Sequence, residues 1–301
     1  MIAAALILLA YAAILSAASP SLSRQRWTGR SPRLAIAMWI AVSGSIFLSV
    51  GVSGVLMIQA WREHHGGLSP TDDSLTIVII NVAIIAASLI ATASVISAAA
   101  TTVIESKRER AHHRFGIRAA AAQMHPRGVT VLPSSVPAAY CLAGKPALIV
   151  VTSAAVEALT ANQLDAVIAH ERAHLRGHHH GLVAVAQTAA RAFPFVPAMR
   201  AFERETARLV ELLADDCASK KHDRRVIAEA LVALASQRTP GLAAASTAAL
   251  ERVNRLIHRS GETLSTGQKI GIAAAFGLML FVPTSLTSAA TAASQALGIC
   301  A

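Results

Sequence analysis

Two histidines and a glutamate stand close together near the middle of the chain, in the segment His170-Glu171-Arg172-Ala173-His174. The preceding residues, 164–169, are predicted to be helical, and on a helix His170 and His174 share one face, one turn apart. Two imidazoles in this arrangement can bind one metal ion. Glu171 lies beside the first histidine, where its carboxylate could take a proton from a water that the metal activates. The spacing therefore predicts a zinc site with Glu171 as the catalytic base.

The helix that must carry this motif has recognisable ends. Thr160 is a suitable N-cap residue, and Gln163 completes a capping box with it. Val167 and Ile168 would give the helix a buried side, and Gly177 is a suitable place for it to end.

Two residues compete to be the third protein ligand that a catalytic zinc normally has. Glu211 is followed four residues later by Asp215, so a helix would place both on one face. Glu211 could then bind the metal while Asp215 hydrogen-bonds a ligating histidine. His180 is the alternative, because Gly177 could turn the chain and return His180 to the metal. We favour Glu211, since the run 178–180 is also typical of a polar helix end; one of its histidines could instead hold the substrate carbonyl.

The composition predicts a membrane protein. Of the 301 residues 54% are hydrophobic and only 15% are charged, with a mean hydropathy of +0.51, which is too apolar for an ordinary soluble domain. A membrane-spanning helix needs about 20 apolar residues. Four uncharged apolar segments predict four membrane helices, at 2–18, 34–60, 75–104 and within 267–301.

The charges of the loops predict the orientation of these helices. Residues 19–33 carry four arginines and no acid, whereas 61–74 contain Glu63, Asp72 and Asp73. The positive-inside rule then places 19–33 and the chain after 105 in the cytoplasm. We expect a membrane region at 1–105, a cytoplasmic metallopeptidase domain at 106–266, and a fourth membrane helix with a short tail at 267–301, in the cell membrane. The first segment could alternatively be a cleaved signal peptide, but no basic residue precedes it.

The predicted cytoplasmic domain contains short strands as well as helices. Strands are expected at 129–132, 138–142 and 147–151, and helices at 181–191, 197–220, 224–236 and 246–258. The predicted fold class is therefore mainly α: a multi-pass membrane protein with four transmembrane helices and a cytoplasmic α+β zincin-like metallopeptidase domain.

The net charge of +10 does not predict nucleic-acid binding. No nucleic-acid module and no interleaving of basic and aromatic residues is present, so anionic lipid beside the cytoplasmic arginines is the expected partner. Cys141, Cys217 and Cys300 are an odd number without metal-binding spacing and are expected to be free thiols.

Four features resemble the integral-membrane zinc metallopeptidases of the BlaR/MecR antirepressor type. They are His-Glu-Arg-Ala-His-Leu-Arg-Gly at 170–177, Ala-Tyr-Cys-Leu-Ala-Gly at 139–144, Glu-Leu-Leu-Ala-Asp-Asp at 211–216, and three spans followed by the protease domain. The last two features are shared with HtpX-like and CAAX prenyl protease relatives. The resemblance implies that His170, His174 and Glu211 bind zinc and that Glu171 is the base. It also implies a winged-helix repressor as substrate.

The chain departs from that family in one respect. No Ser-x-x-Lys motif occurs, and only a short segment follows the last span, so a penicillin-binding sensor domain is missing from this sequence. Three hypotheses follow: a signalling peptidase that cleaves a cytoplasmic repressor, a housekeeping protease for damaged membrane proteins, and a receptor or scaffold without catalysis. The intact Glu171 argues against the third. The sequence predicts neither the oligomeric state nor the inducing signal.

Overall fold

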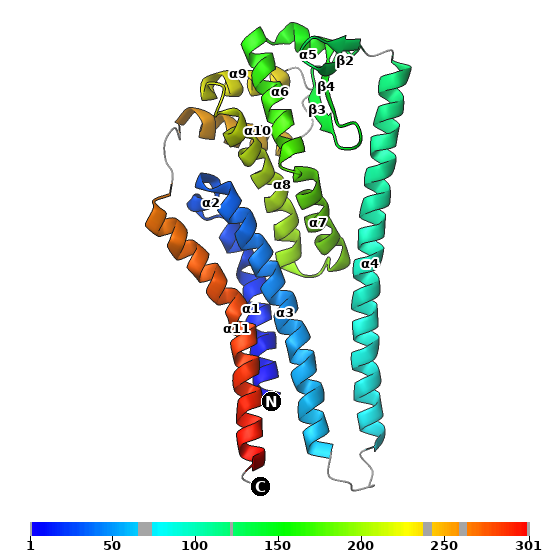
Figure 1. The fold of residues 1–301 in the computed structure, drawn as a ribbon, viewed down its shortest axis with the longest axis vertical. Helices are drawn as coiled ribbons and strands as arrows, with labels where there is room; N and C mark the ends of the chain where they lie inside the picture. Colours follow the sequence, from blue (N-terminus) through cyan, green and yellow to red (C-terminus); the bar gives the residue numbers. More distant parts are fainter. Residues whose placement is uncertain (1, 66–73, 121–122, 237–242, 259–263, 300–301) are drawn as a thin grey trace. The chain divides into compact units, whose positions relative to one another are not determined.

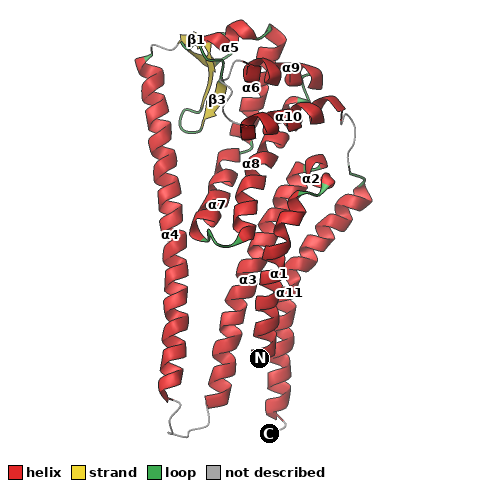
Figure 2. Ribbon diagram, turned by 180° about the vertical axis from the view of Figure 1, so that it is seen from behind, coloured by secondary structure: helices red, strands yellow, loops and turns green. Residues whose placement is uncertain are grey.

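The computed structural model describes residues 2–65, 74–120, 123–236, 243–258 and 264–299 (Figure 1). Most of the acidic loop 61–74, as well as Cys300, lies outside the described residues or their described side chains. The described part is mostly helical with one small sheet, as Figure 2 shows. It divides into two compact units, the first comprising Met1–Ala99, Ala186–Glu205 and Leu264–Ala301, the second Ala100–Val185 and Thr206–Thr263.

The long apolar helices are α1 (Ile2–Ser23), α3 (Pro32–His65), α4 (Ser74–Ala119) and α11 (Thr266–Ile299). By length and composition they include four candidate membrane spans, Ile2–Ser23, Pro32–Ala60, Leu89–Ala119 and Thr266–Ala289. The expected number of apolar helices is thus confirmed. The third apolar segment and the basic residues after it form one continuous helix, α4. A short helix, α2 (Arg26–Arg30), was not expected.

A proline explains one set of polar contacts among the apolar helices. Pro283 lies inside α11 and has no N–H, so the carbonyl of Met279, four residues earlier, loses its helical donor. The hydroxyl of Tyr11 donates to this oxygen at 3.0 Å and that of Ser45 at 2.9 Å. The three helices α1, α3 and α11 are therefore joined at this carbonyl.

The second unit contains the sheet, with strands β1 (Gln123–His125), β2 (Val129–Leu132), β3 (Ala139–Leu142) and β4 (Leu148–Thr152) in the order β1-β2-β4-β3. Strands β2 and β4 are parallel, whereas β1 and β3 are antiparallel to their neighbours. The three predicted strands are confirmed within one or two residues, and β1 was missed. Strand β3 forms one edge of the sheet and contacts α6 (Ala161–Arg176).

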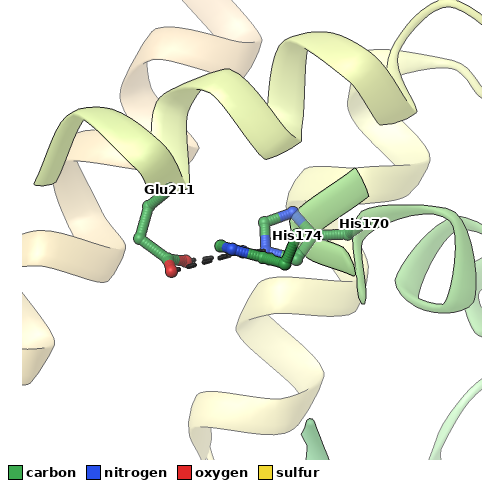
Figure 3. A group of neighbouring side chains, drawn as sticks. All are labelled: His170, His174 and Glu211. Atoms are coloured by element: carbon green, nitrogen blue, oxygen red, sulfur yellow. Dashed lines mark hydrogen bonds and ion pairs between the residues drawn. The ribbon is translucent and has the colours of Figure 1, made fainter. Parts of the chain in front are cut away.

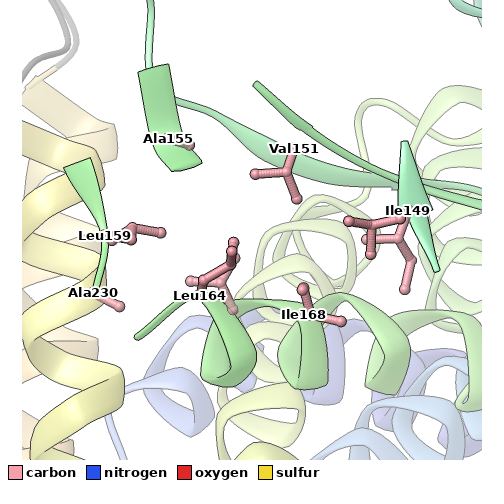
Figure 4. Packing of buried hydrophobic residues seen from close by; sticks show 9 residues of the cluster. Ile149, Val151, Ala155, Leu159, Leu164, Ile168 and Ala230 are labelled. Atoms are coloured by element: carbon pink, nitrogen blue, oxygen red, sulfur yellow. The ribbon is translucent and has the colours of Figure 1, made fainter. Parts of the chain in front are cut away.

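The core of this unit holds α6 against the sheet. Leu164 and Ile168 of α6 pack with Ile149 and Val151 of β4, and all four are buried (Figure 4). The other helices of the chain are α5 (Ser153–Ala158), α7 (His179–Ala192), α8 (Pro197–Ala218), α9 (Arg224–Ser236) and α10 (Ala243–His258). These agree with the helices expected from the sequence apart from a few terminal residues.

Candidate metal centre

Helix α6 fixes the two histidines of the motif. The predicted capping box is present: the Thr160 hydroxyl accepts from the Gln163 N–H, and the Gln163 side chain accepts from the Thr160 N–H. Arg127 binds Asp165 on the same helix. Because both the start and the buried face of α6 are fixed, His170 and His174 are held on one side of a rigid helix.

The structure brings Glu211 of α8 to these two histidines (Figure 3). His170 Nε2 and His174 Nε2 are 3.0 Å apart. Glu211 Oε2 lies 3.5 Å from His170 Nε2, and Oε1 lies 3.4 Å from His174 Nε2. Zinc bonds of about 2.0–2.2 Å at the tetrahedral angle would place neighbouring ligand atoms about 3.3–3.6 Å apart. The three side chains therefore present a donor set whose spacing fits a tetrahedral metal ion.

His170 is oriented by a buried ion pair. Its Nδ1 lies 3.0 Å from Oδ1 of Asp215, which is fully buried, so Nε2 faces Glu211 and His174. The guanidinium of Arg252 on α10 donates to both oxygens of Asp215 at 2.7 and 2.8 Å, and lies 2.8 Å from Glu211 Oε2. Arg252 compensates the negative charge of two carboxylates that burial would otherwise destabilise.

His174 is oriented by another histidine. Its Nδ1 lies 3.0 Å from Nδ1 of His179, the first residue of α7, which is 3% exposed. Helix α6 ends at the predicted Gly177, but the left-handed backbone falls on His178, with φ of 49°. The ring of His179 lies so close to Gly177 that a Cβ there would be 2.3 Å from His179 Nε2. Gly177 thus makes room for the histidine that contacts His174.

The charges of this group determine its protonation. Burial lowers the pKa of His170, but hydrogen bonds from Asp215 and Glu211 outweigh burial and raise it to about 9. Burial lowers the pKa of His174 to about 4. Burial raises the pKa of the carboxyls of Glu211 and Asp215, but their hydrogen bonds and the charge of Arg252 hold both at about 2. Without a metal, the group therefore holds one proton on His170 at neutral pH.

Glu171 faces a more apolar environment than Glu211. Burial is the main reason that its pKa is raised, and the charge of Glu211 adds to it. Its neighbour on the edge strand β3 is Cys141, whose pKa rises to about 12 because of burial and the adjacent Glu171. The thiol therefore stays protonated and can donate a hydrogen bond to the Glu171 carboxylate, to which it is paired.

The structure does not bring the alternative ligand into the group. His180 is exposed, and the only group of three possible metal ligands among the described residues is His170, His174 and Glu211. Asp216, next to the buried Asp215, pairs with Arg255 at 2.8 Å.

Sequence reasoning missed His179 and Arg252. The histidine run 178–180 was interpreted as a polar helix end, although the glycine before it is a signal for a close approach. Arg252 lies on the predicted amphipathic helix, and nothing in its spacing points to Asp215.

A helical chain with apolar helices, a small sheet and a His-His-Glu donor group defines a possible metalloprotein of the membrane-bound class. Comparison with protein families narrows this class: residues 105–248 match peptidase family M48, so this part of the chain carries an M48 domain. The match supports a metallopeptidase function, and the His-His-Glu group is compatible with it. Comparisons of the chain with curated proteins and with solved structures give no significant match.

Proposed function

We propose that the chain is a membrane-bound zinc metalloendopeptidase of the HExxH type that uses Glu211 as the third ligand. The observation that carries this proposal is the meeting of His170, His174 and Glu211 inside an M48 domain, at separations that suit tetrahedral coordination. Two imidazoles and one carboxylate are a donor set that zinc accepts in catalytic sites.

The roles of the residues follow from their contacts. His170, His174 and Glu211 would hold the zinc ion, which when bound would supply Lewis-acid chemistry by activating water near neutral pH and polarising a carbonyl. Glu171, whose pKa is raised by burial, accepts a proton from the attacking water and passes it to the leaving amine. Asp215 orients His170 through Nδ1 and His179 orients His174.

The catalytic domain is proposed to lie on the cytoplasmic side of the cell membrane. Four arginines in 19–33 and the cluster Lys107-Arg108-Glu109-Arg110 that follows the apolar part of α4 support this orientation by the positive-inside rule. The bilayer is then one partner of the chain, and nothing in the described residues points to nucleic acid.

The substrate is proposed to be a protein, and a winged-helix repressor is the first candidate. The support for it is the resemblance of 139–144 and 170–177 to BlaR/MecR-type antirepressor peptidases. Since no Ser-x-x-Lys motif is present, acylation by a β-lactam is not the signal. The second candidate is quality control of membrane proteins, which the M48 match and the HtpX-like features favour.

A substrate-trapping strain tests the proposed activity. Glu171→Gln keeps a side chain of the same size but cannot accept the proton, so substrates should accumulate uncut relative to a wild-type strain. Quantitative proteomics of the two strains separates the candidates: one uncut repressor supports signalling, and many uncut membrane proteins support quality control. Identical proteomes, with wild-type expression verified, would contradict peptidase activity.

A further inference from the structure

The segment that joins α7 to α8 has an apolar composition that the peptidase function does not explain. Residues 192–199 read Ala-Phe-Pro-Phe-Val-Pro-Ala-Met, without a charge, between Arg191 and Arg200. The side chain of Phe195 is 77% exposed. A large aromatic group in this position is costly in water, so the surface around Phe195 calls for an apolar partner.

A ring contact links this segment to a candidate membrane span. The rings of Phe193 and Phe47 lie 5.1 Å apart between centroids, and both residues belong to the unit that contains the apolar helices. Phe47 is near the middle of the candidate span Pro32–Ala60 of α3, about 20 Å from either end at 1.5 Å per residue. The hydrocarbon core of a bilayer is about 30 Å thick. Wherever that core lies along this span, it includes Phe47.

The backbone of the segment also suits a medium without water, where every N–H needs a partner in the protein. The N–H of Phe193 donates to the carbonyl of Ala189, and that of Val196 donates to the carbonyl of Phe193. Pro194 and Pro197 have no N–H to satisfy. The flanking Arg191 and Arg200 are exposed, and side chains of this length reach the lipid headgroups from positions inside the membrane.

We propose that the α7–α8 turn, residues 192–199, inserts into the acyl chains of the bilayer beside α3. This inference rests on the proposed membrane spans but not on the peptidase activity. The occupant of the exposed surface is lipid, because Phe193 contacts a side chain that the hydrocarbon core surrounds. Helix α8, which begins in this turn, also carries Glu211 and Asp215, so insertion would attach the helix of the third ligand to the bilayer.

The experiment compares three single-cysteine variants of the full chain in lipid vesicles, made after the native cysteines are replaced by alanine. Phe195→Cys tests the turn, Phe281→Cys is the lipid-facing control in the candidate span of α11, and Val232→Cys is the water-facing control on α9; the three native side chains are 77%, 68% and 52% exposed. Each cysteine carries an environment-sensitive fluorophore, and the vesicles contain phospholipids with a spin label on the acyl chain. The inserted turn predicts quenching at 195 comparable to that at 281 and several-fold stronger than at 232.

Three other outcomes would overturn the proposal. Quenching at 281 alone shows that the turn lies outside the acyl chains although the spans are correct. No quenching at either 195 or 281 shows that the spans themselves are wrong. A water-shielded fluorophore at 195 that the spin label does not quench shows that a protein covers the turn instead. If the cysteine-free chain does not fold, Phe195→Trp, Phe281→Trp and Val232→Trp with brominated lipids give the same comparison against the native tryptophans. Zinc content and cleavage, measured on the same variants, separate any failure of the proposed peptidase function.

Discussion

Asp215 Oδ1 lies 3.0 Å from His170 Nδ1, and this contact turns His170 Nε2 toward Glu211 and His174. Asp215 and Glu211 are one helical turn apart on α8, so a single helix supplies both the carboxylate at the donor group and the carboxylate behind it. Arg252 binds both carboxylates. The donor group is thus positioned by partners outside it, as metal sites require.

Asp215→Asn should weaken zinc binding. The amide cannot stabilise a ligating imidazole as the carboxylate does, and loss of such a partner typically costs about 10–100-fold in metal affinity. Competition with a chromophoric chelator measures the affinity. Asp216→Asn is the matched control, because Asp216 pairs with Arg255 outside the donor group. Equal affinities in the two variants would show that Asp215 does not orient His170.

Removal of Glu211 decides the third ligand. Glu211→Ala should leave the purified protein without stoichiometric zinc, whereas His180→Ala should keep it, because His180 is exposed and outside the donor group. Metal analysis of both variants gives the answer. Full zinc in Glu211→Ala together with loss in His180→Ala would reverse the assignment.

His179→Ala should also weaken zinc binding, by about 10–100-fold, because His174 Nδ1 loses its partner. Gly177→Ala should have a similar effect, since the new Cβ would lie 2.3 Å from His179 Nε2 and displace the ring. The exposed His180→Ala is the control with normal affinity. Wild-type affinity in both His179→Ala and Gly177→Ala would show that the contact between the two histidines has no role.

Zinc affinity should rise with pH up to about 9. Zinc binds the neutral imidazole, and in the metal-free protein Asp215 and Glu211, against the effect of burial, keep His170 protonated up to a pKa of about 9. Below that pH each unit of acidification should weaken binding about tenfold, which is about 1.36 kcal/mol. His174 adds nothing near neutrality, because burial holds its pKa at about 4. Chelator competition between pH 6 and 9 measures this slope, and a flat profile between pH 7 and 9 is the contrary result.

The local part of the site could be predicted from the sequence. The spacing of His170 and His174, the cap at Thr160 and the end at Gly177 all depend on neighbours within a few residues, and helix geometry converts such spacing into position. The apolar segments were equally clear, because a membrane span is a property of composition and length.

The tertiary part of the site could not be predicted in the same way. Glu211 and His180 both had acceptable spacing, and the structure separates them because α8 passes the donor group whereas His180 faces outward. Arg252 reaches Asp215 from a helix more than thirty residues later, and no local pattern encodes that pairing. His179 was within reach of sequence reasoning, but only if Gly177 is understood as space for a ring as well as a helix end.

The zinc content of the chain, purified without chelators, tests the central claim most directly. The account predicts one zinc ion per chain in the wild type and in Glu171→Gln, almost none in His174→Ala, and no cleavage by either variant, because Glu171 acts on the substrate while His174 holds the metal. A metal-free wild-type protein, or full zinc in His174→Ala, would contradict it.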